Sequence, residues 1–221
     1  MAGNGLIGGL LAAAVFLGAA GAAHSETSVS AYLGYNFTGD SDVDYDFNAG
    51  AGPQSDRFSF EGESFGEPPY YGFRVTHWLE KRESIGISAE FTHAKVVAEA
   101  HPDFDTFEFT NGLNFVMLNG QYRFQNISRF TPYVGVGVGV SLPYVEVVDT
   151  AMTTSTFESQ LAGVAAQGFV GLDVDLIGPV SGFVEYKRTY SAIDAELNGG
   201  GSLETDLWVN QILFGATVTI F

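Results

Sequence analysis

The segment Phe91-Thr-His-Ala-Lys95 places an imidazole and an amine two positions apart. In an extended strand, residues at positions i and i+2 project from the same face, so His93 and Lys95 are expected side by side. An imidazole can take up a proton near neutral pH, and an ammonium group can pair with a phosphate. The pair could therefore act on a phosphorylated ligand. The alternative is that both are surface residues whose polar ends reach water.

Other kinds of catalytic chemistry find little support in the sequence. It contains no cysteine and no His-Glu-x-x-His motif. A disulfide, a thiolate metal site and a thiol nucleophile are therefore excluded. The repeat from Gly135 to Gly139 is not a phosphate loop, because no Lys-Ser/Thr ending follows it.

The elements that position these residues are strands. In Pro132-Tyr-Val-Gly-Val-Gly-Val-Gly-Val-Ser-Leu142, apolar side chains alternate with small or polar ones, and a period of two indicates a strand with two unlike faces. Similar alternation predicts eight strands, at 26–37, 68–79, 84–97, 111–124, 131–147, 161–176, 181–193 and 205–221. No segment between them reads as a helix that could cover the apolar faces, so those faces must meet one another or meet lipid.

The connectors alternate in length along the chain. The links at 80–83, 125–130 and 177–180 are short, and those at 38–67, 98–110, 148–160 and 194–204 are long. Short turns at one end and long loops at the other are typical of outer-membrane barrels, with the turns in the periplasm and the loops outside. We therefore expect an all-β protein, an eight-stranded antiparallel transmembrane β-barrel. Because a barrel of this size is filled by its own side chains, a channel is not expected.

The polar side chains of the strands are expected to line the lumen. Arg74 and Glu90 should lie opposite each other there as an ion pair, and Glu185 and Lys187 should join the same polar column. The last strand is less regular than the others, because the face that includes the terminal Phe221 also carries two threonines. Its register is therefore not settled by the pattern.

The charge distribution is strongly acidic. The chain has 26 acidic and 9 basic residues and a formal charge of −17, which argues against nucleic acid as a partner. Most acids fall in the long connectors. The densest group, Asp40-Ser-Asp-Val-Asp-Tyr-Asp46, resembles part of a calcium loop but lacks its glycine and closing glutamate, so a solvated acidic loop is the alternative.

In this arrangement His93 and Lys95 lie on the outward face near the extracellular rim. The other two histidines after residue 25 have plainer explanations. His77, beside Trp78 near the periplasmic rim, is expected to anchor the barrel in the membrane interface, and His101, next to Pro102, to be an exposed loop residue.

Residues 1–25 have the composition of an export signal. The stretch from Leu6 to Ala23 is apolar and small, and small residues near Ala22 fit a cleavage site, although no basic residue precedes the stretch. The alternative is a helix that anchors the chain in a membrane. We therefore expect residues 26–221 to form the barrel in a bacterial outer membrane, assembled by the barrel-assembly machinery.

Seven blocks of the sequence together resemble a known family. They are Glu67-Pro-Pro-Tyr-Tyr-Gly-Phe-Arg74, Phe91-Thr-His-Ala-Lys95, Phe109-Thr-Asn-Gly-Leu-Asn114, Thr131-Pro-Tyr-Val-Gly-Val-Gly-Val-Gly139, Pro143-Tyr-Val-Glu-Val147, Thr156-Phe-Glu-Ser-Gln-Leu161 and Phe183-Val-Glu-Tyr-Lys187. Their order and spacing resemble the rhizobial lipid A oxidases, a branch of the small outer-membrane β-barrel proteins. The resemblance runs from about residue 28 to the end of the chain.

The resemblance implies an enzyme that uses O₂ as co-substrate to oxidise the proximal glucosamine of lipid A to aminogluconate, with the help of a divalent cation, Mg²⁺ or Ca²⁺. Lipid A, the membrane anchor of lipopolysaccharide, would then be the partner in the outer leaflet. On this hypothesis His93 is the catalytic base and Lys95 meets a lipid A phosphate. Carboxylates near the upper ends of strands would hold the cation, and the candidates are Glu67, Glu108, Glu146 and Glu158.

Two further classes stay open at the level of sequence. The first is a non-enzymatic outer-membrane barrel that supports the membrane or displays adhesive loops. The second is a soluble eight-stranded barrel that binds a small ligand.

Overall fold

The computed structural model describes residues 26–48, 50, 52–79, 82–151 and 155–220. The expected export signal and the terminal Phe221 lie outside the described residues. The described part of the chain is built from strands, and it contains no helix long and apolar enough to cross a membrane. The strands are β1 (Glu26–Thr38), β2 (Ser41–Asp46), β3 (Gln54–Phe58), β4 (Phe60–Gly62), β5 (Tyr71–Leu79), β6 (Arg82–Ala98), β7 (Phe104–Arg123), β8 (Phe130–Asp149), β9 (Ser155–Ser159), β10 (Gly163–Ile177), β11 (Val180–Leu197) and β12 (Gly201–Thr219).

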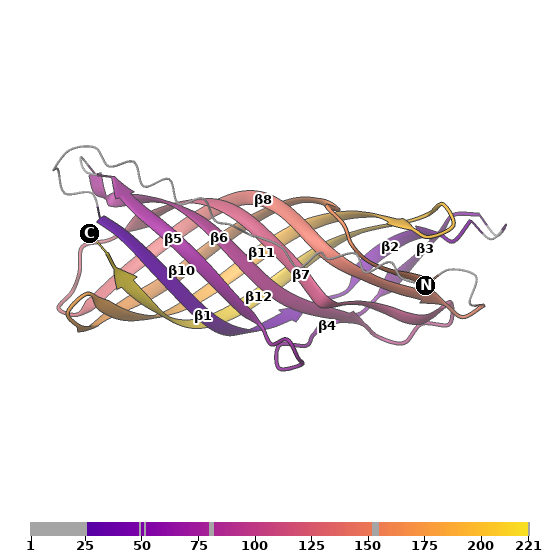
Figure 1. Cartoon of the computed structure of the whole chain (residues 1–221), viewed down its shortest axis with the longest axis horizontal. Coiled ribbons are helices and arrows are strands. Elements are labelled where there is room, and N and C mark those ends of the chain that lie inside the picture. The colour runs from indigo at the N-terminus through magenta and orange to yellow at the C-terminus, as the bar shows by residue number, and fades with distance from the viewer. Residues whose placement is uncertain (1–25, 49, 51, 80–81, 152–154, 221) are drawn as a thin grey trace, which may run out of the picture.

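Eight of these strands close into a ring, which confirms the expected fold. Their order is β1-β5-β6-β7-β8-β10-β11-β12, and antiparallel pairing of β1 with β12 completes the circle (Figure 1). Closure leaves no free edge among the eight strands in the region that they share. The start of β1 and the end of β12 lie at the end of the barrel where the short turns are. The β2–β3 hairpin lies at the opposite end. We take these ends as periplasmic and extracellular.

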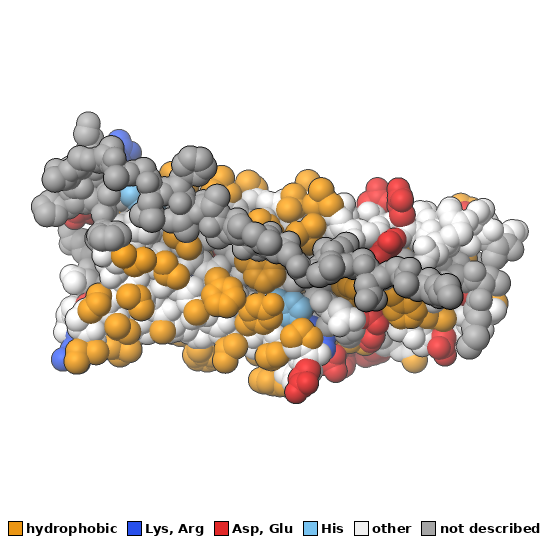
Figure 2. Space-filling view, viewed as in Figure 1, with side chains coloured by type: hydrophobic (Ala, Val, Ile, Leu, Met, Phe, Trp, Pro, Cys, Tyr) orange, Lys and Arg blue, Asp and Glu red, His pale blue; other side chains and the backbone are white. Residues whose placement is uncertain are grey.

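The outer face of the barrel is apolar over the half that is nearer the periplasm. Apolar side chains gather on this half in Figure 2. Val136, for example, is 69% exposed, and many other apolar side chains of these strands are exposed as well. They include Leu33, Phe73, Ile87, Leu118, Val138, Val164, Val170, Phe214 and Val218. In β12 these outward positions are the even ones, which settles the register of the last strand. An exposed apolar surface that encircles a closed barrel is the surface expected to face lipid.

The lumen of this half is filled by charged and polar side chains. Arg74 lies between two carboxylates, with Nη2 at 2.8 Å from Glu90 Oε1 and 2.7 Å from Glu185 Oε1. The Lys187 ammonium also contacts Glu90, and it lies 3.6 Å from Glu185. The expected polar column is therefore confirmed. Two cations balance two anions, so that each buried charge is paired.

Above this half the polarity of the barrel is reversed. Val43 and Tyr45 of β2 are buried, whereas Asp42 and Asp44 on its other face are exposed. The inside of this region is an apolar core that is rich in aromatic rings, among them Phe58, Phe60, Phe104, Phe107 and Phe109. We call this upper part of the molecule the extension. It consists of β2, β3, β4 and β9 and of the upper ends of β6, β7, β8, β11 and β12. Acidic side chains gather on its surface, at the end where β2 and β3 lie (Figure 2).

Much of the sequence that was expected to form long loops forms strands of the extension. Segment 38–67 contains β2, β3 and β4, and β9 lies within 148–160. The upper ends of β6, β7, β8, β11 and β12 also run beyond their expected limits. The reason is that these segments also alternate, but with apolar residues inward and acids outward. The acidic segment from Asp40 to Asp46 is consequently largely a strand rather than a loop.

The barrel wall is irregular where β6, β7 and β8 enter the extension. The pairing of β6 with β7 shifts between Ala94 and Val96, and that of β7 with β8 shifts between Glu108 and Leu113. On the other side of β6, β4 ends opposite Val96 and β5 begins opposite His93, so that segment 63–70 leaves the ladder. These irregularities surround His93 and Lys95.

Candidate functional site

Strand β6 places His93 and Lys95 on its outward-facing side. Ile87 and Ala89, at the same alternating positions lower on the strand, are exposed toward the lipid. His93 and Lys95 are nevertheless only 3% and 4% exposed. The expected face is therefore found, but the two side chains are covered rather than open to the leaflet.

The imidazole of His93 is held in one orientation. Its ring stacks on Tyr71 at 5.0 Å between centroids, and its Nδ1 lies 2.8 Å from Asn114 Oδ1. The Asn114 amide nitrogen donates to the carbonyls of Leu142 and Gly112, so its oxygen is the acceptor for His93. Nδ1 therefore carries the proton, and Nε2 keeps the basic lone pair of the neutral ring.

Nε2 of His93 is buried and has no hydrogen-bond partner of good geometry. The Pro68 backbone lies close enough to the ring to interact with it. On the opposite side, Gly112 has φ of +125°, and a Cβ there would lie 2.6 Å from the His93 ring. Glycine is therefore needed at 112 for both its backbone conformation and its lack of a side chain.

The cover over Lys95 is segment 63–70. Lys95 Nζ lies 3.4 Å from Glu63 Oε2 and 3.2 Å from the Glu67 carbonyl oxygen, to which it donates. Ser64 fixes the segment to β1, because its hydroxyl accepts from the Asn36 amide and donates to the Asn36 side chain. At the tip of the segment Phe65 is 81% exposed and contacts Tyr35.

The four predicted cation ligands are not gathered in one place. Glu108 and Glu146 lie opposite each other on β7 and β8, and Asn111 donates to Glu146. Glu67 belongs to segment 63–70, and Glu158 lies on β9, where it accepts from Gln160 at 3.2 Å. Within the described ranges no group of three or more His, Asp or Glu could hold a metal ion. As the described side chains stand, the four carboxylates do not come together as a cation site.

The other candidates of the sequence have local roles. His77 lies at the periplasmic end of β5 and shares a hydrogen bond of 3.0 Å with Thr27. His101 stacks on Phe58 at 4.4 Å. The β2 acid Asp42 and its neighbour Asp40 form ion pairs with Arg57, at 3.2 and 3.5 Å.

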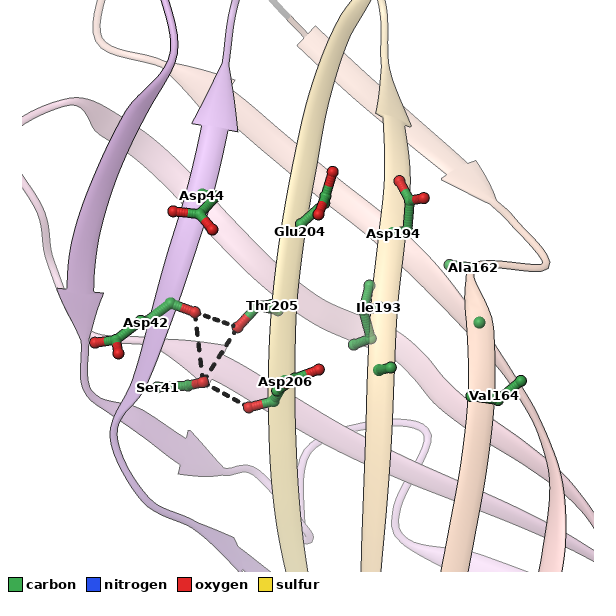
Figure 3. Close-up of a pocket in the computed structure, with 12 residues that line it drawn as sticks. Ser41, Asp42, Asp44, Ala162, Val164, Ile193, Asp194, Glu204, Thr205 and Asp206 are labelled. Atoms are coloured by element: carbon green, nitrogen blue, oxygen red, sulfur yellow. Dashed lines mark hydrogen bonds between the residues drawn. The ribbon is translucent and has the colours of Figure 1, made fainter.

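A groove with a volume of about 530 Å³ lies on the extension (Figure 3). Its walls are β2, β12, β11 and the start of β10, and Asp44, Glu204 and Asp194 stand along it. Ser41 and Thr205 are hydrogen-bonded across its floor. The groove is a separate acidic feature, because His93 and Lys95 do not line it.

Several features of the site were not recognised in the sequence. Tyr71 could have been found, because hairpin pairing places it opposite His93. Gly62-Glu63-Ser64-Phe65-Gly66 has the Gly-x-Ser-x-Gly spacing, but Ser64 is bonded to Asn36 instead of an imidazole, and no helix follows it. Asn114 is the ladder partner of His93 on β7, and Gly112 lies two residues away at the register shift. The sequence does not reveal either of them, because the long connector at 98–110 leaves the pairing of β6 with β7 undetermined.

Comparison with solved structures finds the same fold at low sequence identity. Neisserial surface protein A matches with a TM-score of 0.51 at 11% identity, over 88% of this chain and 98% of that chain. The outer membrane protein OprG from Pseudomonas aeruginosa matches with a TM-score of 0.50 at 16% identity, over 89% of this chain and 98% of that chain. No family model matches the sequence, and no curated protein matches it.

The closed ring, its apolar outer belt and these two likenesses define an eight-stranded outer-membrane β-barrel. The chain therefore spans the membrane with the lower halves of its strands, and the extension stands above the outer leaflet.

Proposed function

We propose that this protein is a lipid A oxidase that works at the outward face of β6. Its substrate is the proximal glucosamine of lipid A, and O₂ is the co-substrate. Two protons, one from C1–H and one from the C1 hydroxyl, and the two electrons of the C1–H bond pass to O₂, which becomes H₂O₂. The sugar becomes a lactone, and water opens the lactone to aminogluconate.

The observation that carries the proposal is the unpartnered Nε2 of His93 beside Lys95, on the outward face where the apolar belt ends. Lipid A presents its sugars and phosphates at this level of the outer leaflet. His93 Nε2 takes the proton of the C1 hydroxyl, and Lys95 pairs with a lipid A phosphate in place of Glu63.

Access to the site requires segment 63–70 to move. His93 and Lys95 are nearly completely covered, and the Lys95 ammonium group is paired with the Glu63 carboxylate. Phe65 already projects from this segment toward the lipid-facing side chain of Tyr35. Contact of the segment with the leaflet is therefore the event that uncovers the pair.

The test is the mass spectrum of lipid A from aerobic cells that lack the gene or express it. Expression should add a species that is heavier by one oxygen atom. His93→Gln should abolish this species, while His77→Gln, a matched change at the other end of the barrel, should leave it unchanged. Each variant is first shown to be folded by its heat-modifiable migration. Unchanged lipid A with the folded wild-type protein would reject the proposal.

A non-enzymatic surface protein is the second candidate, and the extension favours it. This region has its own apolar core and displays several groups of acidic side chains on its surface, which suits a binding platform. In that case lipid A would be unchanged, and acid-to-amide changes on β2 would reduce the binding of cells to a cationic surface.

A further inference from the structure

Arg188 is an exposed cation on the lipid-facing side of the barrel, remote from His93. It lies on β11, which is separated from β6 by β7, β8 and β10 in one direction and by β5, β1 and β12 in the other. Below Arg188 on the same face are Tyr186 and Val184, and above it is Tyr190, followed by Asp194 further up. Arg188 therefore sits near the upper edge of the apolar belt.

The guanidinium group of Arg188 is held by an aromatic ring and not by an acid. It lies 4.4 Å from the centre of the Trp208 ring, and Trp208 in turn packs on Tyr190 at 5.1 Å. Within the described residues no acid forms an ion pair with Arg188. Asp206, on the same face of β12, interacts instead with Tyr190. A charge on the lipid face is costly unless it meets an anion or water.

The neighbours of Arg188 supply a second donor and free space. Asn210 is the partner of Arg188 on β12. The side-chain oxygen Oδ1 of Asn210 accepts a hydrogen bond from the Tyr186 hydroxyl at 2.8 Å, which leaves the side-chain nitrogen Nδ2 to donate. On β10 the partner is Gly168, where an added Cβ would meet only the Gly135 carbonyl oxygen, at 3.9 Å. An anion next to the guanidinium would therefore have two donor groups and a side left open by glycine.

We propose that Arg188, Asn210 and Gly168 form a binding site for the phosphate of an outer-leaflet lipid. A planar guanidinium held on a ring binds phosphate with little loss of freedom. The acyl chains of that lipid lie on the belt below, where Val184, Val170 and Ile212 are exposed. The site is independent of sugar oxidation, and it exists whether or not the chain is an enzyme.

The charge of the molecule favours a lipid over a dissolved anion. The formal charge is −17, and Asp194, Glu204 and Asp206 stand on the outward face above Arg188. These acids repel an anion that approaches from water. A lipid phosphate reaches Arg188 by diffusion within the leaflet, and its acyl chains contribute apolar contacts that a free phosphate lacks.

Native mass spectrometry of the whole protein in detergent tests the site. Diphosphoryl lipid A and its dephosphorylated form are titrated in a Lys95→Gln background, which removes the cation next to His93. The parent protein should prefer the phosphorylated lipid, and Arg188→Gln should weaken its binding about tenfold. Gly168→Val keeps the charge but fills the open side, and it should weaken binding as well.

Arg57→Gln is the matched control, because Arg57 is exposed but lies on the extension with acidic partners. It should leave lipid binding unchanged. Full binding by both Arg188→Gln and Gly168→Val would overturn the site, and so would equal binding of the two lipids by the parent protein. Competition by millimolar inorganic phosphate would show an anion site that is not specific for lipid, and would overturn the assignment to a lipid.

Discussion

Arg74 is the residue on which charge balance in the lumen depends. It contacts both Glu90 and Glu185, and the Lys187 ammonium is shared between the same two carboxylates. The charged ends of all four side chains are sealed from water, so removal of one cation leaves an excess negative charge. Such an uncompensated buried charge costs more than the original pair contributes.

Arg74→Met should therefore lower the free energy of unfolding by about 3–5 kcal/mol. Arg123→Met is the matched control, because Arg123 is partly exposed and pairs with Glu26 near the periplasmic end. Its loss should cost about 1 kcal/mol or less. Urea unfolding in detergent micelles, followed by tryptophan fluorescence, measures both, and equal losses would contradict the central role of Arg74.

Tyr45 gives the extension a dependence on alkaline pH. Burial, followed by hydrogen bonds to Asp103 and Asp56, raises the pKa of its hydroxyl well above the ordinary value. Because the neutral phenol is favoured in the folded state, its contribution is complete below a pH of about 10 and is lost as the pH rises further. Tyr45→Phe should reduce the loss of stability above that pH. A spectrophotometric titration tests the pKa: the wild-type protein and Tyr45→Phe should show the same tyrosinate absorbance up to a pH of about 11, because Tyr45 stays neutral there.

At the scale of elements, each long strand serves two environments. The lower part of β12 turns Phe214 and Val218 toward lipid, whereas its upper part turns Leu203 and Leu207 into the core of the extension. The side-chain period of two continues through both parts, but the polarity of the two faces is exchanged. One strand can thus connect a polar lumen to an apolar core without a break.

Leu203→Ala should destabilise the extension while sparing the barrel. Leu203 is buried between its partners Tyr45 and Ala195, so truncation removes packing worth about 2–5 kcal/mol. Hydrogen exchange should accelerate in β2 and upper β12 and stay slow around Phe214. Glu204→Ala, the outward neighbour, should have no such effect. Uniform acceleration through all of β12 would show that the two parts unfold together.

The eight-strand ring and the lumen ion pairs could be predicted from sequence, because alternation and hairpin pairing determine both. The extension was predicted as loops, since acids such as Asp42 and Asp44 concealed the inward partners Val43 and Tyr45. The face of His93 was predicted correctly from its spacing in β6. Its burial was not, because it depends on segment 63–70 and on the register shift at Gly112, which are tertiary features.

At the scale of the whole molecule, the barrel is closed to solutes. The four charged side chains and their polar neighbours Tyr32, Asn119 and Gln167 are hydrogen-bonded across the lumen. The cavity on the periplasmic side, next to Arg74 and Thr76, has a volume of about 30 Å³, close to that of one water molecule. Among the described residues, the outer face and the extension are therefore the surfaces that are open to a ligand.

Planar bilayers that contain the purified protein should show no stable ion conductance. The physical reason is that an ion would have to break the network around Arg74 to pass. A large-pore porin reconstituted in parallel serves as the positive control. Steady openings by the wild-type protein would contradict the closed lumen.

The exchange of polarity between the two halves of the barrel also fixes the height of the protein relative to the bilayer. A shift toward the periplasm would bring the outward acids of the extension into hydrocarbon, and a shift the other way would expose belt residues such as Val136 to water. Both movements are opposed by strands that carry both kinds of side chain, such as β12 with Asp206 above and Phe214 below. The surrounding bilayer must therefore adjust its thickness to this protein, and the protein does not slide to suit the bilayer.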